Sequence, residues 1–128
     1  MTPTQRTLKA LRDRGAICGI VERFNQYAGQ YGIRQDLFGF IDIIAIEPAL
    51  KQITGVQSTG SAFSMHLHMI LVERKEPAMQ WLISGGRIEL WGWRKLKVKR
   101  GGKAMVWTPR MREIVLTDFE RVEVKTPT

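Results

Sequence analysis

Two apolar runs near the middle of the chain constrain its fold most. The stretch GFIDIIAIEPALKQITGVQSTG, residues 39–60, holds both runs, and Pro48 separates them. Each run is rich in β-branched residues, which favour strands, and proline ends a strand because it has no N–H to donate. We therefore expect two buried strands. Yet Asp42 lies inside the first run, and Gln57 and Thr59 lie near the end of the second.

The pattern along the whole chain predicts an α/β (α+β) protein. Thr2 can cap a helix that has Pro3 in its first turn, Gln5 as the partner of a capping box, and its end near Gly15. The other elements that we expect are strands over 16–25, 38–46, 53–59, 87–100, 103–108 and 112–119, a loop over 26–35, and helices over 61–74, capped by Ser61, and over 78–84. This order of elements indicates a mixed sheet flanked by helices.

Length and cysteine content bound the class of protein. The 128 residues are enough to bury one core, so we expect a single domain over 1–128. Cys18 is the one cysteine, which excludes an internal disulfide and indicates a reducing compartment. The N-terminus does not resemble a signal peptide, and no apolar run approaches the roughly 20 residues of a membrane span. We therefore expect a cytoplasmic protein that does not enter a membrane.

The positive charge is confined to one segment of the chain. The net charge is +8, and residues 90–112 contain no aspartate or glutamate, so the rest of the chain carries as many basic as acidic residues. The basic residues of the segment are Arg94, Lys95, Lys97, Lys99, Arg100, Lys103, Arg110 and Arg112, interleaved with Trp91, Trp93 and Trp107. A basic strip with aromatic residues is typical of a surface that binds nucleic acid. The alternative is a hairpin that its charge keeps in solution.

Asp42, Gln57 and Thr59 are the first candidates for a functional site. Side chains alternate between the two faces of a strand, so Gln57 and Thr59 share one face of the second run. If the two strands are neighbours, Asp42 can join them in one pocket. An isolated buried carboxylate is costly, and Mg²⁺ prefers oxygen ligands such as a carboxylate and an amide carbonyl. Asp42 and Gln57 can therefore bind a metal ion. In the alternative, Asp42 caps a turn or pairs with a basic residue.

Three blocks of the sequence resemble the PD-(D/E)XK nuclease superfamily. They are IRQDLFGFIDIIAI, TGVQSTGS and WLISGGRIELWGWRK, and the resemblance runs from about Thr4 to Glu113. In particular, the chain resembles the small phage and bacterial members that are described as Holliday-junction-resolvase-like. The resemblance implies a restriction-endonuclease-like αβββαβ core, a Mg²⁺ or Mn²⁺ cofactor, and Asp42 as a metal ligand. It also implies a location in a bacterial or phage-infected cell.

The chain departs from this family at its E-x-K motif, where it has Gln57 and Thr59. Glutamine keeps an oxygen that can bind a metal, whereas threonine can hold a water but brings no positive charge. Glu22 and Asp36 are acids that can replace the missing charge. Arg34, Lys51 and Lys75 are the bases that can do so.

Two functions from different classes follow from these residues. The first is a metal-dependent endonuclease that cleaves DNA, with branched DNA as the substrate that the resemblance implies and a homodimer to match a two-fold junction. Its catalytic residues would be Asp42, Gln57, Thr59 and Glu22, and its DNA contacts would be Arg34, Arg94, Lys95, Lys97, Lys99, Arg100 and Lys103. The second is a nuclease-like module that binds nucleic acid without cleaving it. A hairpin that binds another protein is a third possibility.

Other conspicuous residues have simpler interpretations. His66 and His68 would point about 200° apart on a helix, so we expect them to pack or to lie at the surface rather than to chelate one ion. Cys18 is expected to be a small core residue. Trp91 and Trp93 share a face of their strand, where they can either stack on bases or pack under a helix.

Overall fold

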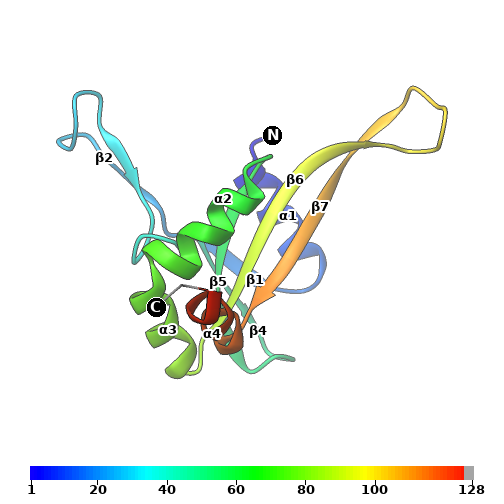
Figure 1. Cartoon of the computed structure of the whole chain (residues 1–128). Helices are drawn as coiled ribbons and strands as arrows, with labels where there is room; N and C mark the ends of the chain where they lie inside the picture. Colours follow the sequence, from blue (N-terminus) through cyan, green and yellow to red (C-terminus); the bar gives the residue numbers. More distant parts are fainter. Residues whose placement is uncertain (126–128) are drawn as a thin grey trace.

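The molecule is built around one mixed β-sheet, shown in Figure 1. The structure, a computed structural model, describes the backbone of residues 1–125 and the side chains of residues 1–120, and residues 126–128 of the expected domain lie outside the described residues. The strands are β1 (Ile17–Ile20), β2 (Arg23–Asn25), β3 (Ile33–Gln35), β4 (Ile43–Glu47), β5 (Gln52–Thr59), β6 (Arg87–Lys97) and β7 (Met105–Ile114). The helices are α1 (Pro3–Asp13), α2 (Phe63–His68), the π-helical η1 (Met69–Glu73), α3 (Lys75–Ile83) and α4 (Leu116–Lys125).

The sheet has the strand order β1–β4–β5–β6–β7. Strands β5 and β6 run parallel, and the other neighbouring pairs are antiparallel. The chain returns from the end of β5 to the start of β6 through α2, η1 and α3, because parallel neighbours need a long crossover. The expected α/β class, with a mixed sheet flanked by helices, is confirmed.

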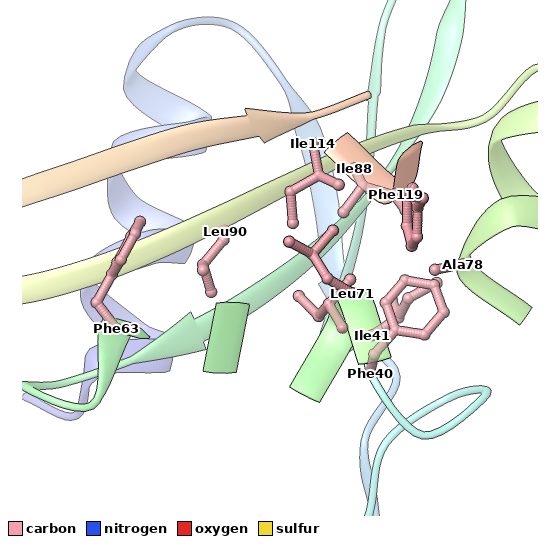
Figure 2. Packing of buried hydrophobic residues seen from close by; sticks show 10 residues of the cluster. Phe40, Ile41, Phe63, Leu71, Ala78, Ile88, Leu90, Ile114 and Phe119 are labelled. Atoms are coloured by element: carbon pink, nitrogen blue, oxygen red, sulfur yellow. The ribbon is translucent and has the colours of Figure 1, made fainter. Parts of the chain in front are cut away.

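Two apolar clusters cover the two faces of the sheet. On one face, Leu8 and Leu11 of α1 pack against Ile43 and Val56. On the other face, the crossover helices and α4 bury the second cluster, whose members include Phe40, Ile41, Ile70, Leu71, Ala78, Ile88, Leu90, Ile114 and Phe119 (Figure 2). Adjacent residues of one strand therefore serve opposite faces, as the alternation of β side chains requires.

The start of α1 forms as the sequence predicts. Thr2 accepts a hydrogen bond from the Gln5 backbone, and the Gln5 side chain accepts one from the Thr2 backbone, which completes the capping box. Deeper in the helix, the buried Thr7 hydroxyl accepts a hydrogen bond from the Trp93 indole at 2.8 Å. Trp93 and Trp91 belong to the cluster under α1. Of the two alternatives for these tryptophans, packing under a helix is therefore confirmed.

Several expected elements differ in the structure. The strand over 16–25 breaks after β1, because the backbone N–H groups of Val21 and Glu22 both bind the Asp42 carbonyl and turn the chain away from the sheet. Residues 26–35 are not only a loop, since β3 pairs with β2 in an antiparallel hairpin. The strand over 38–46 begins only at β4.

The other differences concern helix ends. The prediction of a strand over 112–119 is wrong beyond Ile114. The Asp118 carboxylate accepts a hydrogen bond from the Val115 N–H, and helix α4 begins there. Ser61 does not cap the following helix, whose N-cap is Ala62 without a side-chain hydrogen bond. Helix α3 starts at Lys75, earlier than expected, with Pro77 in its first turn, where proline is tolerated.

Two hairpins project from the body of the molecule on either side of α2, as Figure 1 shows. One is β2–β3, and the other is the long β6–β7 hairpin that carries the basic segment. Within the part of the chain that the structure describes, no helix is long and apolar enough to cross a membrane.

Candidate functional site

A tight turn before β4 brings two aspartates together. Leu37 and Ile41 form an antiparallel bridge with backbone hydrogen bonds of 2.9 and 3.0 Å, so Asp36 and Asp42 leave the bridge side by side. The turn needs left-handed backbone at Phe38 (φ 56°) and Gly39 (φ 80°). Glycine adopts this conformation without strain, and a phenylalanine rarely does.

Asp42 is held rigidly by its neighbours on β5. Its side chain is 4% exposed, and its Oδ2 accepts hydrogen bonds from the Ser58 backbone N–H at 2.8 Å and from the Gln57 amide at 2.5 Å. The Ser58 hydroxyl points to the opposite face of the sheet, where it bonds with the Thr7 hydroxyl at 2.8 Å. The expectation that neighbouring strands bring Asp42 and Gln57 together is therefore met.

Glu22 is the third acid at this place. The Asp42 carbonyl accepts hydrogen bonds from the Val21 and Glu22 N–H groups at 2.8 and 3.3 Å, which ties the end of the first sheet strand to the turn. One oxygen each of Glu22, Asp36 and Asp42 lies within 4.8 Å of the others. We call these three residues the acid cluster. Asp42 is buried and the other two are half-buried, so a solvent path to the cluster exists.

The acid cluster is electrostatically unfavourable without a cation. Burial, a hydrogen bond with Asp36 and the charge of Asp36 raise the pKa of Asp42 to about 8, against the opposing effect of the Ser58 and Gln57 hydrogen bonds. Three carboxylate oxygens at such short separations are the donor set that hard divalent cations such as Mg²⁺ and Mn²⁺ prefer. The residues present therefore fit a divalent metal ion.

Gln57 differs from expectation in its orientation. Its amide nitrogen donates to Asp42 and, at 3.4 Å, to Asp36, while its amide oxygen lies 3.4 Å from Nδ1 of His66. The reason is that the Asp42 and Asp36 oxygens at these contacts act as acceptors, so they bind the amide nitrogen, which is the donor of the Gln57 side chain. The amide oxygen that we expected to bind metal beside Asp42 thus faces His66 of α2 instead.

His66 packs beside the site, a contact that the sequence analysis, which expected only a packing or surface role for it, did not predict. Its proximity follows from chain order, because α2 starts directly after β5 and its first turns lie over the end of that strand. Thr59 is buried on the same strand face as Gln57 and pairs with Gly92 of β6 in the parallel register.

No protein family, no curated protein and no solved structure matches this chain. An assignment of function therefore depends on the geometry of the site.

The three bases considered as replacements for the missing lysine lie in different places. Arg34 of β3 forms an ion pair with Glu22 at 3.5 Å, although its side chain is 77% exposed. Lys51 lies in the turn between β4 and β5, at the end of β5 away from Gln57. Lys75 is the first residue of α3. Arg34 is therefore a positive charge that the structure brings to the acid cluster.

Two hollows beside the acid cluster are lined by arginines. One, of about 640 Å³, is lined by Asp36, Arg23, Arg34 and Arg74, among others. The second, of about 570 Å³, includes Glu22, Arg23 and Arg34 and extends to the start of α1. Arginine forms strong paired hydrogen bonds with phosphate oxygens. An anionic backbone can therefore approach the acids from either hollow.

The basic segment forms the second arm of the molecule. The exposed basic residues of its outer half and tip are Arg94, Lys95, Lys97, Lys99, Arg100 and Lys103. Trp107 on the returning strand lies between two cations, with the Arg6 guanidinium 4.1 Å and the Lys95 ammonium 5.3 Å from its ring centre. In Figure 1 this hairpin projects on the other side of α2 from the β2–β3 hairpin.

Proposed function

We propose that the protein is a metal-dependent endonuclease that cleaves DNA, with branched DNA as its substrate. The observation that carries this proposal is the acid cluster, whose three oxygens lie within 4.8 Å of one another beside arginine-lined hollows. Carboxylates that would repel one another gain most from a divalent cation, and phosphodiester hydrolysis is a reaction that such a cation assists.

The residues of the site have separable roles in this proposal. Glu22, Asp36 and Asp42 would hold Mg²⁺ or Mn²⁺, which when bound lowers the pKa of a water molecule and stabilises charge on the phosphate. The Ser58 N–H and the Gln57 amide orient the Asp42 carboxylate. Arg34, which forms an ion pair with Glu22, would place its positive charge beside the phosphate. The basic hairpin would hold the backbone without reading its sequence.

The arrangement of the sheet supports the same proposal. Helix α1 is followed by the antiparallel strands β1, β4 and β5, and then by a helical crossover to the parallel strand β6. This order supports the αβββαβ core that a restriction-endonuclease-like fold would have. Asp42 directly precedes β4, and Gln57 and Thr59 end β5, where the resemblance to the PD-(D/E)XK superfamily expects the metal ligand and the E-x-K motif. Cleavage of a two-fold junction would further require a homodimer.

The test is cleavage of labelled DNA by the purified protein. A four-way junction, a linear duplex and a single strand are incubated with Mg²⁺, with Mn²⁺ or with EDTA. We expect metal-dependent cleavage that Asp42→Asn and Asp36→Asn each reduce more than about 100-fold, because each removes a metal ligand. The matched control is Asp13→Asn, since Asp13 is an exposed acid of α1 that pairs with Lys9. No cleavage of any of the three DNAs in either metal would end the proposal.

A nuclease-like module that binds DNA without chemistry is the second candidate. The observation that favours it is Thr59 in place of a lysine, together with the Gln57 amide nitrogen facing the carboxylates. This candidate predicts no metal binding at millimolar Mg²⁺ in a calorimetric titration. It also predicts that Asp42→Asn leaves DNA affinity unchanged or raises it, because one charge that repels phosphate is gone.

A further inference from the structure

The β2–β3 hairpin is inserted between two members of the acid cluster. Glu22 directly precedes β2, and Asp36 directly follows β3. Cross-strand pairs hold the two strands in register, with Arg23 opposite Gln35 and Phe24 opposite Arg34. Anything bound along this hairpin is therefore placed relative to the acids through a few residues of paired backbone.

The tip of this hairpin is aromatic and uncharged, in contrast to the basic β6–β7 hairpin. Residues 26–32, QYAGQYG, include no charged side chain, and Tyr27 and Tyr31 are 87% and 84% exposed. Two almost fully exposed tyrosines on one short loop indicate a binding surface rather than a part of the core. Their chemistry suits flat, apolar and polar-edged groups, not phosphate.

The tip is also ordered by its own contacts. The Phe24 ring lies across Gly32, where a Cβ atom would come within 2.2 Å of it, and Gly32 has the positive φ (86°) that glycine tolerates. The Asn25 side chain accepts a hydrogen bond from the Tyr27 backbone N–H at 3.0 Å. The tyrosines are thus presented by a braced turn, which lowers the entropy lost when a ligand binds.

Three types of side chain occupy successive positions from the base of the β2–β3 hairpin to its tip. The acids lie at the root, Arg23 and Arg34 lie on the first paired residues, and the tyrosines lie at the end. A strand rises about 3.3 Å per residue, so Tyr27, in the turn just beyond β2, lies no more than about 16 Å along the chain from Glu22. A nucleic-acid strand whose phosphates meet the arginines can therefore present its bases to the tyrosines.

We propose that the β2–β3 hairpin stacks Tyr27 and Tyr31 on unpaired bases next to the cleavage site. The substrate class is then DNA with unpaired or splayed bases near the bond that is cut, because an uninterrupted duplex hides its base faces. This inference rests on the proposed function, since it deepens the substrate class of the same site. Arginines between acids and tyrosines favour nucleic acid over a second copy of the chain as the occupant.

The experiment measures DNA binding in EDTA, so that it does not depend on cleavage. The probes are a fluorescein-labelled duplex and the same duplex with a central unpaired stretch that contains 2-aminopurine. We expect tighter binding to the second probe, and quenching of 2-aminopurine as a tyrosine stacks on it. Tyr27→Ala and Tyr31→Ala should each weaken binding to this probe about tenfold, with unchanged affinity for the duplex, because base–aromatic stacking contributes that much per base.

The matched controls keep the ring or change the tip elsewhere. Tyr27→Phe and Tyr31→Phe should bind and quench like the wild type, and so should Gln26→Ala. Equal binding to both probes, or tyrosine variants with unchanged preference and quenching, overturns the inference and leaves the proposed endonuclease in place. If the Tyr→Ala variants instead convert a dimer to a monomer in sedimentation, with DNA preference unchanged, the tip is a self-association surface. Binding to neither probe refutes the proposed function and the inference together.

Discussion

Asp42 is almost completely buried beside Asp36, and two N–H groups point at one of its oxygens. Its pKa, raised to about 8 by burial and by Asp36, lies far above the value of about 4 for an exposed aspartate. The folded metal-free protein therefore holds this proton more tightly than the unfolded chain does. The contribution of Asp42 to stability is present below about pH 4 and is lost progressively as the pH rises to about 8.

The raised pKa of Asp42 predicts how the Asp42→Asn substitution changes stability in the absence of metal. Asparagine resembles the protonated acid and keeps an oxygen for the Ser58 and Gln57 donors. In EDTA, we expect the variant to melt at a higher temperature than the wild type at pH 8, by several degrees, and at a similar temperature at pH 4. Adding Mg²⁺ at pH 8 should raise the melting temperature of the wild type and not that of the variant. A wild type that is the more stable of the two in EDTA at pH 8 would contradict the assigned electrostatics.

Glu89 is a second buried acid, with the opposite electrostatics. It lies on β6 under α1 and accepts hydrogen bonds from Arg14, Arg87 and the Trp91 indole. Burial alone would raise the pKa of Glu89, but the hydrogen bonds and charge of Arg14, with further donors, lower it overall. Its stabilising effect is therefore present above the usual glutamate pKa and is lost as the pH falls through the lowered value.

Glu89→Gln should destabilise the fold by about 3 kcal/mol at pH 7, because it leaves two arginines around a buried neutral group. Urea denaturation measures this loss. The matched control is Glu113→Gln, which removes a carboxylate that pairs with Arg87 at the half-exposed rim and should cost less than about 1 kcal/mol. Equal losses for the two variants would show that the buried network is not a stabilising element.

At the scale of secondary structure, the two projecting hairpins carry different side chains, and the proposed function gives each of them a different contact with DNA. The β6–β7 hairpin carries exposed cations, whereas the β2–β3 hairpin carries uncharged aromatic residues at its tip. Phosphate contacts release counterions and therefore depend on salt, while stacking on bases does not. The two hairpins should consequently respond differently to ionic strength.

Neutralising the β6–β7 hairpin tests this division. For the variant in which Lys97, Lys99 and Arg100 are all changed to Gln, we expect the slope of log affinity against log salt to become shallower by about 2 to 3, close to one per lost cation. The preference for unpaired over paired DNA should stay unchanged. Lys51→Gln, in the turn between β4 and β5, is the control and should leave the slope as it is. A triple variant with the wild-type slope would exclude the hairpin from the DNA contact.

The sequence predicts the elements whose signals are local. The capping box of α1 and strand β5 both depend on a few adjacent residues. The break after Ile20 and the start of α4 depend instead on hydrogen bonds to distant or unexpected partners, namely the Asp42 carbonyl and the Asp118 carboxylate. β-branched residues at both places favour a strand. The distant Asp42 carbonyl overrides that preference after Ile20, and the hydrogen bond of the nearby Asp118 carboxylate to Val115 overrides it at the start of α4.

At the scale of the whole molecule, the site shows the same contrast between what local patterns predict and what contacts between distant residues determine. Strand alternation was enough to bring Asp42 and Gln57 to one face. The convergence of Glu22 and Asp36 on them required a turn with left-handed backbone at Phe38, which no residue preference predicts. The sequence offers Glu22, from the first expected strand, and Asp36, close to Asp42 in the sequence, as acids that can replace the missing charge, but no local pattern predicts that both lie beside Asp42. Only in the folded chain does one oxygen of each lie within 4.8 Å of the others.

Ser58 joins the two halves of the molecule across the sheet. Its backbone orients Asp42 on one face, and its hydroxyl meets Thr7 of the N-terminal helix on the other. If heating loosens helix α1, Ser58 alone would therefore transmit the displacement to the Asp42 carboxylate. If the proposed function holds, cleavage of DNA should then be lost on warming before the sheet melts.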